Sequence, residues 1–571
     1  MKAAVDFPEP STDADLISPR AFHGAAIQES NPDPDAPKGL FESARLNQAM
    51  GMYLPATVVV RLVNFARVLL LTWWMLPQQF GLLNMILLAI NVLIPLCSLG
   101  LNEAVTRYVP QEETRGSVRA FAFRSFVLLL VVTGASALLM CVFSSELSGF
   151  FYAQISADAR IRTELGPAAD RLARVSAGVT GLVIIYFFLL AVFKGLRMFK
   201  AVALMEIVHA LMFLAACTGA GLLDRRSAIH ITTLYGLSLA VPIGFFGLAF
   251  ANSLGRWRTQ GRPTEQGAWI GKLLRFSVWT TLAGVTWQVL VYYPSWYLNK
   301  LHGHAAVAVF TAPRQIGQFI LIGAVAVATV AMTTVTKTWE RKGREAAKWQ
   351  LSMAFRGTGL ALLVLCAVMS LTRNWIMLMF RPDYMPGADI LPLHLLFFLI
   401  AAYLSFLAIH FHLIERTRHL FWPWAVGVGT NVLFAYWLAG PGGDVVRGST
   451  AWNWAASASS GWFITGFSSP QGLDCASWCG VFSIATALLL CVGLIRAECT
   501  RLDRGTYIIM FAAVLLGMTP WILAAGTLLL IGVACRTDFI FTKLERQLVH
   551  GYLLDTLRHV PVPGRRRNRG E

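Results

Sequence analysis

The 571-residue chain is too apolar for a water-soluble fold, because 56% of its residues are hydrophobic and only 14% are charged, against roughly 25% charged residues in soluble domains. Its formal net charge of +17 does not indicate a nucleic-acid partner, since the Lys and Arg residues are spread over short loops and form no single basic patch. These numbers predict a multi-pass membrane protein whose loops contact anionic lipid.

The first 38 residues combine acidic residues and prolines with no apolar periodicity. Such a segment buries no core, so we expect residues 1–38 to form a disordered cytosolic tail. The segment also lacks the basic and apolar regions of a secretory signal peptide. Insertion into the membrane is therefore expected to begin with the first apolar span.

Apolar runs of about twenty residues, long enough to cross a hydrocarbon core of roughly 30 Å, recur along the rest of the chain. They predict an all-α integral membrane protein of 12–14 transmembrane helices in two six-helix bundles, at 39–254 and 272–496, joined by a cytosolic linker at 255–271. The expected spans lie near 51–75, 80–102, 121–143, 175–193, 201–222, 230–252, 276–297, 305–333, 352–372, 388–411, 420–439 and 477–495.

A last apolar stretch, within residues 497–536, crosses the membrane either once or twice. One crossing would place the basic tail at 537–571 outside, whereas two short crossings hinged at Gly517 and Pro520 would return it to the cytosol. Each short crossing would hold only about fifteen residues, which is below the usual range. We favour the helical hairpin because it keeps the basic tail inside.

The distribution of basic residues predicts the orientation. With a cytosolic N-terminus, the loops on the cytosolic side carry more than twice as many Lys and Arg residues as the opposite loops, as the positive-inside rule requires. The loop at 441–474 would then be periplasmic. Its Trp residues suit either sugar stacking or anchoring at the membrane surface, and Cys475 and Cys479 near its end suit either a disulfide or two free thiols.

Charged residues at membrane depth usually line a cavity or pair with another group. The first span holds Arg61 and Arg67, about 9 Å apart along the axis and about 120° apart around it, and contains no acidic residue. In the eighth span, Arg314 follows Pro313 about ten residues inside an apolar run. Each Arg suits structural pairing with an acid or a carbonyl, but two in one helix favour a cavity that binds phosphate through the bidentate guanidinium.

Two further groups of polar residues lie in the predicted spans. Glu206 and His209, three residues apart in the fifth span, could couple transport to protons, although a hydrated structural pair is the simpler interpretation. The seventh span contains aromatic residues, including Tyr292 and Trp296, which we interpret as an interfacial belt. The remaining motifs include no phosphate-cradling Gly-rich loop, no zinc-ligand spacing and no catalytic triad context. We therefore expect no enzyme activity, no cofactor and no metal.

Several motifs resemble polysaccharide flippases of the multidrug/oligosaccharidyl-lipid/polysaccharide exporter superfamily. The segments at 76–81 (LPQQFG) and 99–110 (LGLNEAVTRYVP) resemble the turn after the first helix and the end of the second helix in that family. The pair Arg61 and Arg67 is similar to the first helix of the lipid II flippase branch, and residues 312–314 (APR) resemble its eighth helix. The resemblance covers roughly residues 40–440, while the acidic N-terminal tail and the 441–474 loop depart from it.

The resemblance implies a V-shaped pair of six-helix bundles in a bacterial inner membrane, with a cationic central cavity that opens to each side in turn. It makes Arg61, Arg67 and Arg314 candidates for holding the diphosphate of a polyprenyl-linked oligosaccharide. Arg107, near the cytoplasmic mouth, is a further candidate, although its place at a helix end also suits a purely topogenic role. The implied partners are the lipid-linked oligosaccharide, membrane lipids and polysaccharide-assembly proteins.

Three functions therefore compete: an oligosaccharide-lipid flippase, a cation-coupled multidrug exporter of the same superfamily, and a membrane polysaccharide polymerase or ligase. Two arginines in the first helix favour the flippase, since a drug exporter would more naturally carry an acid there. The 441–474 loop holds few ionisable residues, which argues against the polymerase or ligase.

Overall fold

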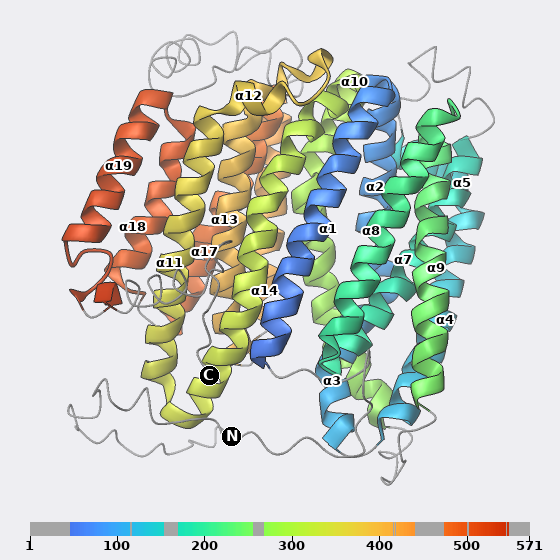
Figure 1. Ribbon diagram of the computed structural model, residues 1–571, viewed down its shortest axis with the longest axis horizontal. Coiled ribbons are helices and arrows are strands. Elements are labelled where there is room, and N and C mark those ends of the chain that lie inside the picture. The colour runs from blue at the N-terminus through green and yellow to red at the C-terminus, as the bar shows by residue number, and fades with distance from the viewer. Residues whose placement is uncertain are drawn as a thin grey trace, which may run out of the picture.

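The computed structural model is a bundle of helices that run roughly parallel to one another (Figure 1). The predicted tail at 1–38, nearly all of the loop at 441–474, most of the linker at 255–271 and most of the basic tail at 537–571 lie outside the residues that the structure describes. The described residues are 46–114, 117–152, 169–254, 268–414, 416, 418–439, 473–498, 502–543 and 545–547.

Among the described residues, eight helices form the N-terminal bundle. They are α1 (Leu46–Trp74), α2 (Pro77–Ser98), α3 (Leu101–Thr114), α4 (Val118–Val142), α5 (Ser144–Phe151), α7 (Ala169–Gly195), α8 (Phe199–Leu222) and α9 (Ala228–Leu254). The turn between α1 and α2 lies at the top of Figure 1, so we call that end of the molecule the upper end and the opposite end the lower end. Pro77 starts α2 because its fixed φ suits the first helical turn.

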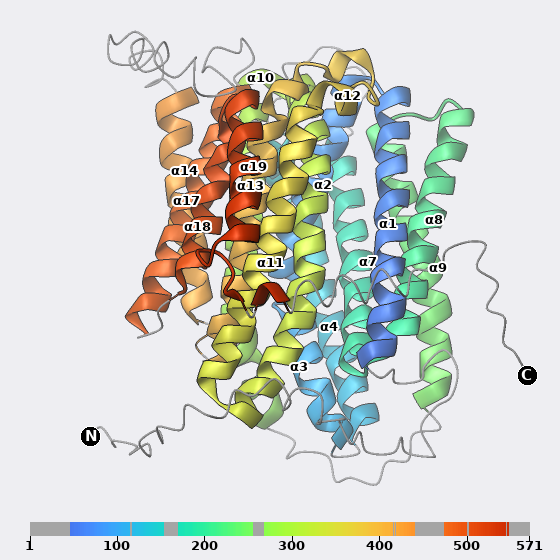
Figure 2. The same ribbon diagram turned by 60° about the vertical axis from the view of Figure 1, so that its left-hand side comes forward.

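The second half of the chain forms the C-terminal bundle and a hairpin. Its elements are α10 (Ala268–Lys342), α11 (Arg344–Leu371), α12 (Arg373–Met377), the 3-10 helix η4 (Pro382–Tyr384), α13 (Gly387–Leu413), α14 (Arg418–Ala439), α17 (Leu473–Ala497), α18 (Arg504–Ala512), the 3-10 helix η5 (Ala513–Gly517) and α19 (Pro520–Arg536). The two bundles lie side by side (Figures 1 and 2).

The element α10 consists of two helical segments that meet at Gly303. The backbone of Gly303 has a φ of +77°, a conformation that costs a glycine little and strains other residues. The kink separates the seventh from the eighth predicted span, at the position where the sequence places the boundary between them. Because the chain reverses there, residues equally far from Gly303 on its two sides lie at similar depth.

The core of the C-terminal bundle is α13, whose residues are nearly all buried. It packs against α10, α11 and α17, and its sequence is apolar all round, as expected for a helix enclosed by other helices. In the N-terminal bundle, α7 packs against α2, α3, α4 and α9. Between the bundles, α2 packs along α10, so this helix pair forms much of the wall between the two halves.

The predicted fold class is confirmed. Among the described residues, ten helices are long and apolar enough to cross a membrane. If the two segments of α10 are counted separately and the 22-residue α14, which is not one of those ten, is added, the described part of the chain contains twelve crossings. The apolar segments Arg504–Gly517 and Pro520–Arg536 add the shorter hairpin, and the protein is therefore a multi-pass membrane protein with two six-helix halves.

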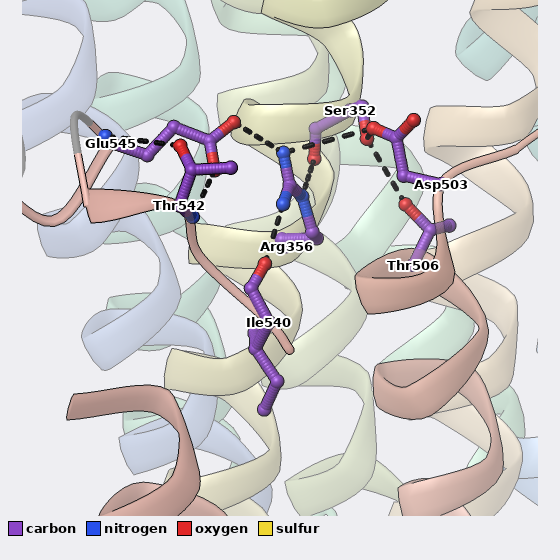
Figure 3. Close-up of polar contacts among 7 residues, drawn as sticks. All are labelled: Ser352, Arg356, Asp503, Thr506, Ile540, Thr542 and Glu545. Atoms are coloured by element: carbon purple, nitrogen blue, oxygen red, sulfur yellow. Dashed lines mark hydrogen bonds and ion pairs between the residues drawn. The ribbon is translucent and has the colours of Figure 1, made fainter. Parts of the chain in front are cut away.

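The hairpin is held at both ends by one buried arginine of α11, Arg356 (Figure 3). Its guanidinium lies 2.5 Å from the Glu545 carboxylate and 3.7 Å from that of Asp503, and it donates to the carbonyl of Ile540. Ser352, one turn earlier, donates to the same Asp503 carboxylate. Asp503 precedes α18, whereas Ile540 and Glu545 follow α19, so the chain leaves and returns at the same level of the molecule.

Candidate functional site

A cavity of about 250 Å³ lies between the two bundles and is lined by side chains of α1, α2, α8, α9 and α10. Its lining combines charged, amide and aromatic groups with apolar ones. The charged and aromatic members are Arg67, Phe80, His209, Phe213, Tyr235, Tyr292 and Arg314, and the amides are Asn64, Asn84, Asn91, Gln315 and Gln318. The structure therefore brings two of the predicted arginines, one from each bundle, to a single site.

Arg67 enters the cavity from α1 and rests on an aromatic ring of α8. Its guanidinium carbon lies 4.4 Å from the centre of the Phe213 ring, a geometry that stabilises the cation through the ring quadrupole. Among the described residues, no carboxylate forms an ion pair with Arg67. The charge is thus positioned by packing and is available to an anion in the cavity.

Arg314 enters from the second segment of α10, and only 4% of its surface is exposed. It donates to the main-chain carbonyl of Val291, in the first segment of the same element. The rings of Tyr292, Phe397 and Phe398 each lie 5.6 Å from its guanidinium carbon. Its Nε finds no hydrogen-bond partner among the described residues, and a buried donor without a partner is costly. A bound anion would offset that cost.

The formal charges that line the cavity are positive. Two guanidinium groups line it, and the lining contains no Asp or Glu among the residues that the structure describes. A cleft lined by charge of one sign attracts ions of the opposite sign, so this site favours anions. The amides add neutral donors and acceptors, and the side chain of Asn84 is turned by its hydrogen bond to the Phe80 carbonyl at 2.8 Å.

Three of the predicted site residues, Arg61, Arg107 and Glu206, lie outside this lining. Arg61 is close enough to Glu206 of α8 for a Coulombic interaction, and its Nε is buried with no hydrogen-bond partner in the described part of the chain. Glu206 itself forms an ion pair of 3.8 Å with Lys194. Arg107 is exposed on α3 at the lower end, beside the ring of Tyr108.

The structure separates the predicted pair of Glu206 and His209. His209 lines the cavity, and its ring is packed among Tyr186, Phe213 and Tyr235 at centroid distances of 5.2, 6.4 and 5.7 Å. Glu206, one turn earlier on α8, is not among the lining residues. Of the two, only His209 therefore carries its titratable group at the cavity surface.

Sequence reasoning missed the amides and assigned Tyr292 to an interfacial belt. For Tyr292 that interpretation is wrong, because its side chain lines the cavity and its hydroxyl accepts a hydrogen bond from Asn91. The spacing of these amides from the arginines could have predicted that they line the same cavity. Asn64 lies three residues before Arg67 and Gln318 four residues after Arg314, spacings that place each amide on the same helix face as its arginine.

Above the cavity, the two bundles are in direct contact. A methyl group on Gly81 of α2 would lie 1.8 Å from the carbonyl oxygen of His304 in α10, so glycine is required for this approach. Trp73 of α1 donates through its indole to the Met379 carbonyl at 2.9 Å. These contacts join the bundles at the upper end of the molecule.

Comparison with known proteins is consistent with this architecture. The model of the family described as polysaccharide biosynthesis protein matches residues 47–339, more than half of the chain. A search of curated protein sequences gives no significant match.

Several solved structures share the fold at low sequence identity. The lipid II flippase MurJ in an inward closed conformation is 12% identical with a TM-score of 0.59, and the match covers 88% of this chain and 97% of that one. A MOP superfamily transporter from Pyrococcus furiosus is 13% identical with a TM-score of 0.57, covering 82% and 100%. An outward-facing multidrug resistance MATE family transporter is 13% identical with a TM-score of 0.56, covering 81% and 98%.

Proposed function

Because the chain belongs to the family of polysaccharide biosynthesis proteins and has the fold of MOP superfamily transporters, we propose that it is a flippase for polyprenyl-diphosphate-linked oligosaccharide. The observation that carries the proposal is the placement of Arg67 and Arg314 in one cavity whose described lining holds no carboxylate. The transport step would be alternating access, in which the two bundles rock about the bound head group.

The chemistry of the cavity suits a diphosphate. A diphosphate that links a lipid to a sugar carries two negative charges, and the two guanidinium groups offer one positive charge each from opposite bundles. Guanidinium forks bind phosphate oxygens in a bidentate manner. An anion held between Arg67 and Arg314 would therefore tie the bundles together through its own oxygens.

The size of the cavity limits what it encloses. Its volume of about 250 Å³ lies below the roughly 300–1,000 Å³ of typical ligand pockets. The site thus suits the diphosphate and its immediate surroundings, with the lipid chain and most of the glycan extending beyond it. Export of cationic drugs fits this site less well, because a cation would meet two fixed positive charges.

Arg61 and Arg107 keep a role in the proposal as residues of the approach path. Neither lines the cavity, but a positive potential along the route would raise the local concentration of the anionic head group. Proton coupling is proposed at His209, which faces the cavity, with Glu206 held in its ion pair with Lys194.

Replacing each of the two cavity arginines tests the proposal. Arg67→Ala and Arg314→Ala are expected to lower flipping of lipid-linked oligosaccharide by about 10- to 100-fold, the range for a lost hydrogen bond to a charged group. The Lys variants should fall in between, because an ammonium keeps the charge but lacks the bidentate fork. The measurement is flipping in reconstituted vesicles, normalised to folded protein.

The matched control is Arg119→Ala, which removes an exposed arginine of α4 outside the cavity lining and should leave flipping unchanged. In cells, loss of function should make lipid-linked intermediates accumulate on the cytosolic face. Wild-type flipping by both cavity Ala variants, at wild-type folded yield, would refute the proposed site.

A further inference from the structure

A hydrogen bond crosses the wall of the cavity from one bundle to the other. The side-chain amide of Asn91 in α2 donates to the hydroxyl of Tyr292 in α10 at 3.1 Å. Asn91 belongs to the N-terminal bundle and Tyr292 to the C-terminal bundle, and both side chains line the cavity. We call this bond the Asn91–Tyr292 clasp.

The same turn of α10 also holds Arg314 in place. The carbonyl of Val291 accepts a hydrogen bond from the Arg314 guanidinium, and the Tyr292 ring lies 5.6 Å from its central carbon. One side chain therefore contacts the anion-binding cation through its ring and the opposite bundle through its hydroxyl. Displacing Tyr292 would alter the surroundings of Arg314 directly.

The depth of these groups follows from the kink at Gly303. Tyr292 lies eleven residues before Gly303 and Arg314 eleven residues after it, so each is about 16 Å from the kink along its segment. Asn91 lies ten residues, or about 15 Å, below Gly81, which touches His304 beside the kink. The clasp and the cation thus share one level, well below the contact that joins the bundles at the upper end.

We propose that Tyr292 is a positioning residue that links the closed arrangement of the bundles to the placement of Arg314. The inference rests on the proposed function, because it assigns Arg314 to the anion. Separation of α2 from α10 at this level breaks the clasp and releases the Tyr292 ring. The position of the Arg314 guanidinium in the cavity then changes. Conversely, an anion that bridges Arg67 and Arg314 stabilises the arrangement in which the clasp is formed, since such coupling is reciprocal.

The test uses the full chain in lipid nanodiscs, with spin labels at Leu223 in the N-terminal bundle and Trp375 in the C-terminal bundle. These upper-end residues have exposed fractions of 73% and 78%. Tyr292→Phe keeps the ring and removes the hydroxyl, and Asn91→Leu removes the donor. Each variant is expected to change the ratio of the two label-to-label distance populations, with the clasp formed and with it broken. The expected change is about 2- to 12-fold, the range for one net hydrogen bond.

The double variant should shift the distribution no further than either single variant, because both remove the same bond. Tyr293→Phe is the matched control, since this neighbouring tyrosine does not line the cavity. Binding of inorganic diphosphate to the same samples provides the second readout, and the clasp variants are expected to weaken it by a similar factor.

The outcomes separate the two ideas. If Arg314→Ala weakens diphosphate binding while Tyr292→Phe changes neither distance nor binding, the clasp is refuted and the anion site stands. If Arg314→Ala leaves diphosphate binding unchanged, the anion site is refuted, and with it the link between Tyr292 and anion binding. Additive shifts in the double variant would also overturn the clasp, because they would mean that the two side chains act through different contacts.

Discussion

At the scale of single residues, the site depends on which face of a helix each charge occupies. Arg67 reaches the cavity, whereas Arg61 lies near Glu206, which is itself paired with Lys194. Ion pairs of this kind satisfy a charge locally and add little to ligand binding. Under the proposed function, the cations that bind the substrate are those whose guanidinium groups contact aromatic rings and carbonyls instead of carboxylates, as Arg67 and Arg314 do.

A prediction at this scale concerns the pH dependence of transport. Protonated His209 would add a third positive charge to the cavity, so the apparent affinity for the anionic substrate should rise as the pH falls through the titration of His209. Burial and the nearby Arg67 charge both oppose protonation of the imidazole, so we expect this dependence only at acidic pH, and His209→Gln should flatten it there. The measurement is the KM for flipping in vesicles as the pH is lowered from neutral into the acidic range.

The partner variant Glu206→Gln serves as the comparison. Because Glu206 pairs with Lys194 and does not line the cavity, we expect its removal to leave the pH profile unchanged. A flattened profile in Glu206→Gln together with an unchanged profile in His209→Gln would assign proton coupling to the carboxylate instead.

The sequence identified the intramembrane arginines as candidates but did not show which of them faces the cavity. Residues six positions apart on a helix point about 120° away from each other, so one narrow cavity accommodates one of them and the other turns to a neighbouring helix. The sequence alone does not say which one, because that depends on where α8 packs. The interpretation of Tyr292 fails for a related reason: an aromatic residue in the last turns of a span suits both an interfacial belt and a cavity lining, and only the packing of α2 against α10 distinguishes the two.

At the scale of helices, the C-terminal hairpin depends on one buried ion pair. The side chains of Arg356 and Glu545 are 6% and 1% exposed, and the backbone N–H of Thr542 donates to the same carboxylate at 2.8 Å. Removing one member of such a pair leaves the other charge buried and unpaired, at a cost of roughly 3–5 kcal/mol. The hairpin itself is short and exposes large apolar side chains, among them Trp521 and Leu529.

We therefore expect Glu545→Gln to release the segment after α19 while the two bundles stay folded. Limited proteolysis should then cleave between residues 537 and 547 well before it cleaves the wild-type protein. The control is Asp538→Asn, which removes an exposed pair with Arg546 at 2.7 Å and should matter little, since surface pairs contribute about 0–1 kcal/mol. Equal cleavage rates for Glu545→Gln and the wild type would show that the pair does not hold the segment.

At the scale of the whole molecule, the two halves and their crossings could be predicted because the bilayer imposes length and apolarity on every span. The predicted spans near 276–297 and 305–333 appear as the two segments of α10, and the hairpin turns between Gly517 and Pro520 as expected. The cavity could not be predicted in the same way. It arises where five helices from two distant parts of the chain meet, and no local pattern encodes that meeting.

The last prediction is the orientation of the molecule, which the distribution of charge determines. The lower end carries the basic ends of several helices, including Lys194 at the end of α7, Lys200 at the start of α8 and Arg197 between them. The upper end carries fewer basic residues, such as Arg225 and Arg373. Lys and Arg resist translocation, so we expect the lower end to face the cytosol. Single-cysteine variants at Glu345 and Trp375 test this, because both side chains are well exposed and lie at opposite ends of α11 and α12.

The native cysteines must first be replaced, since Cys141 and Cys535 are exposed and would react themselves. An impermeant thiol reagent added to intact spheroplasts should label Trp375→Cys and leave Glu345→Cys unlabelled until the membrane is opened. The reverse pattern would invert the topology. Labelling in the expected order would place the basic end on the cytosolic side, where, under the proposed function, a diphosphate would meet Arg107 and Arg61 before it reaches Arg67 and Arg314.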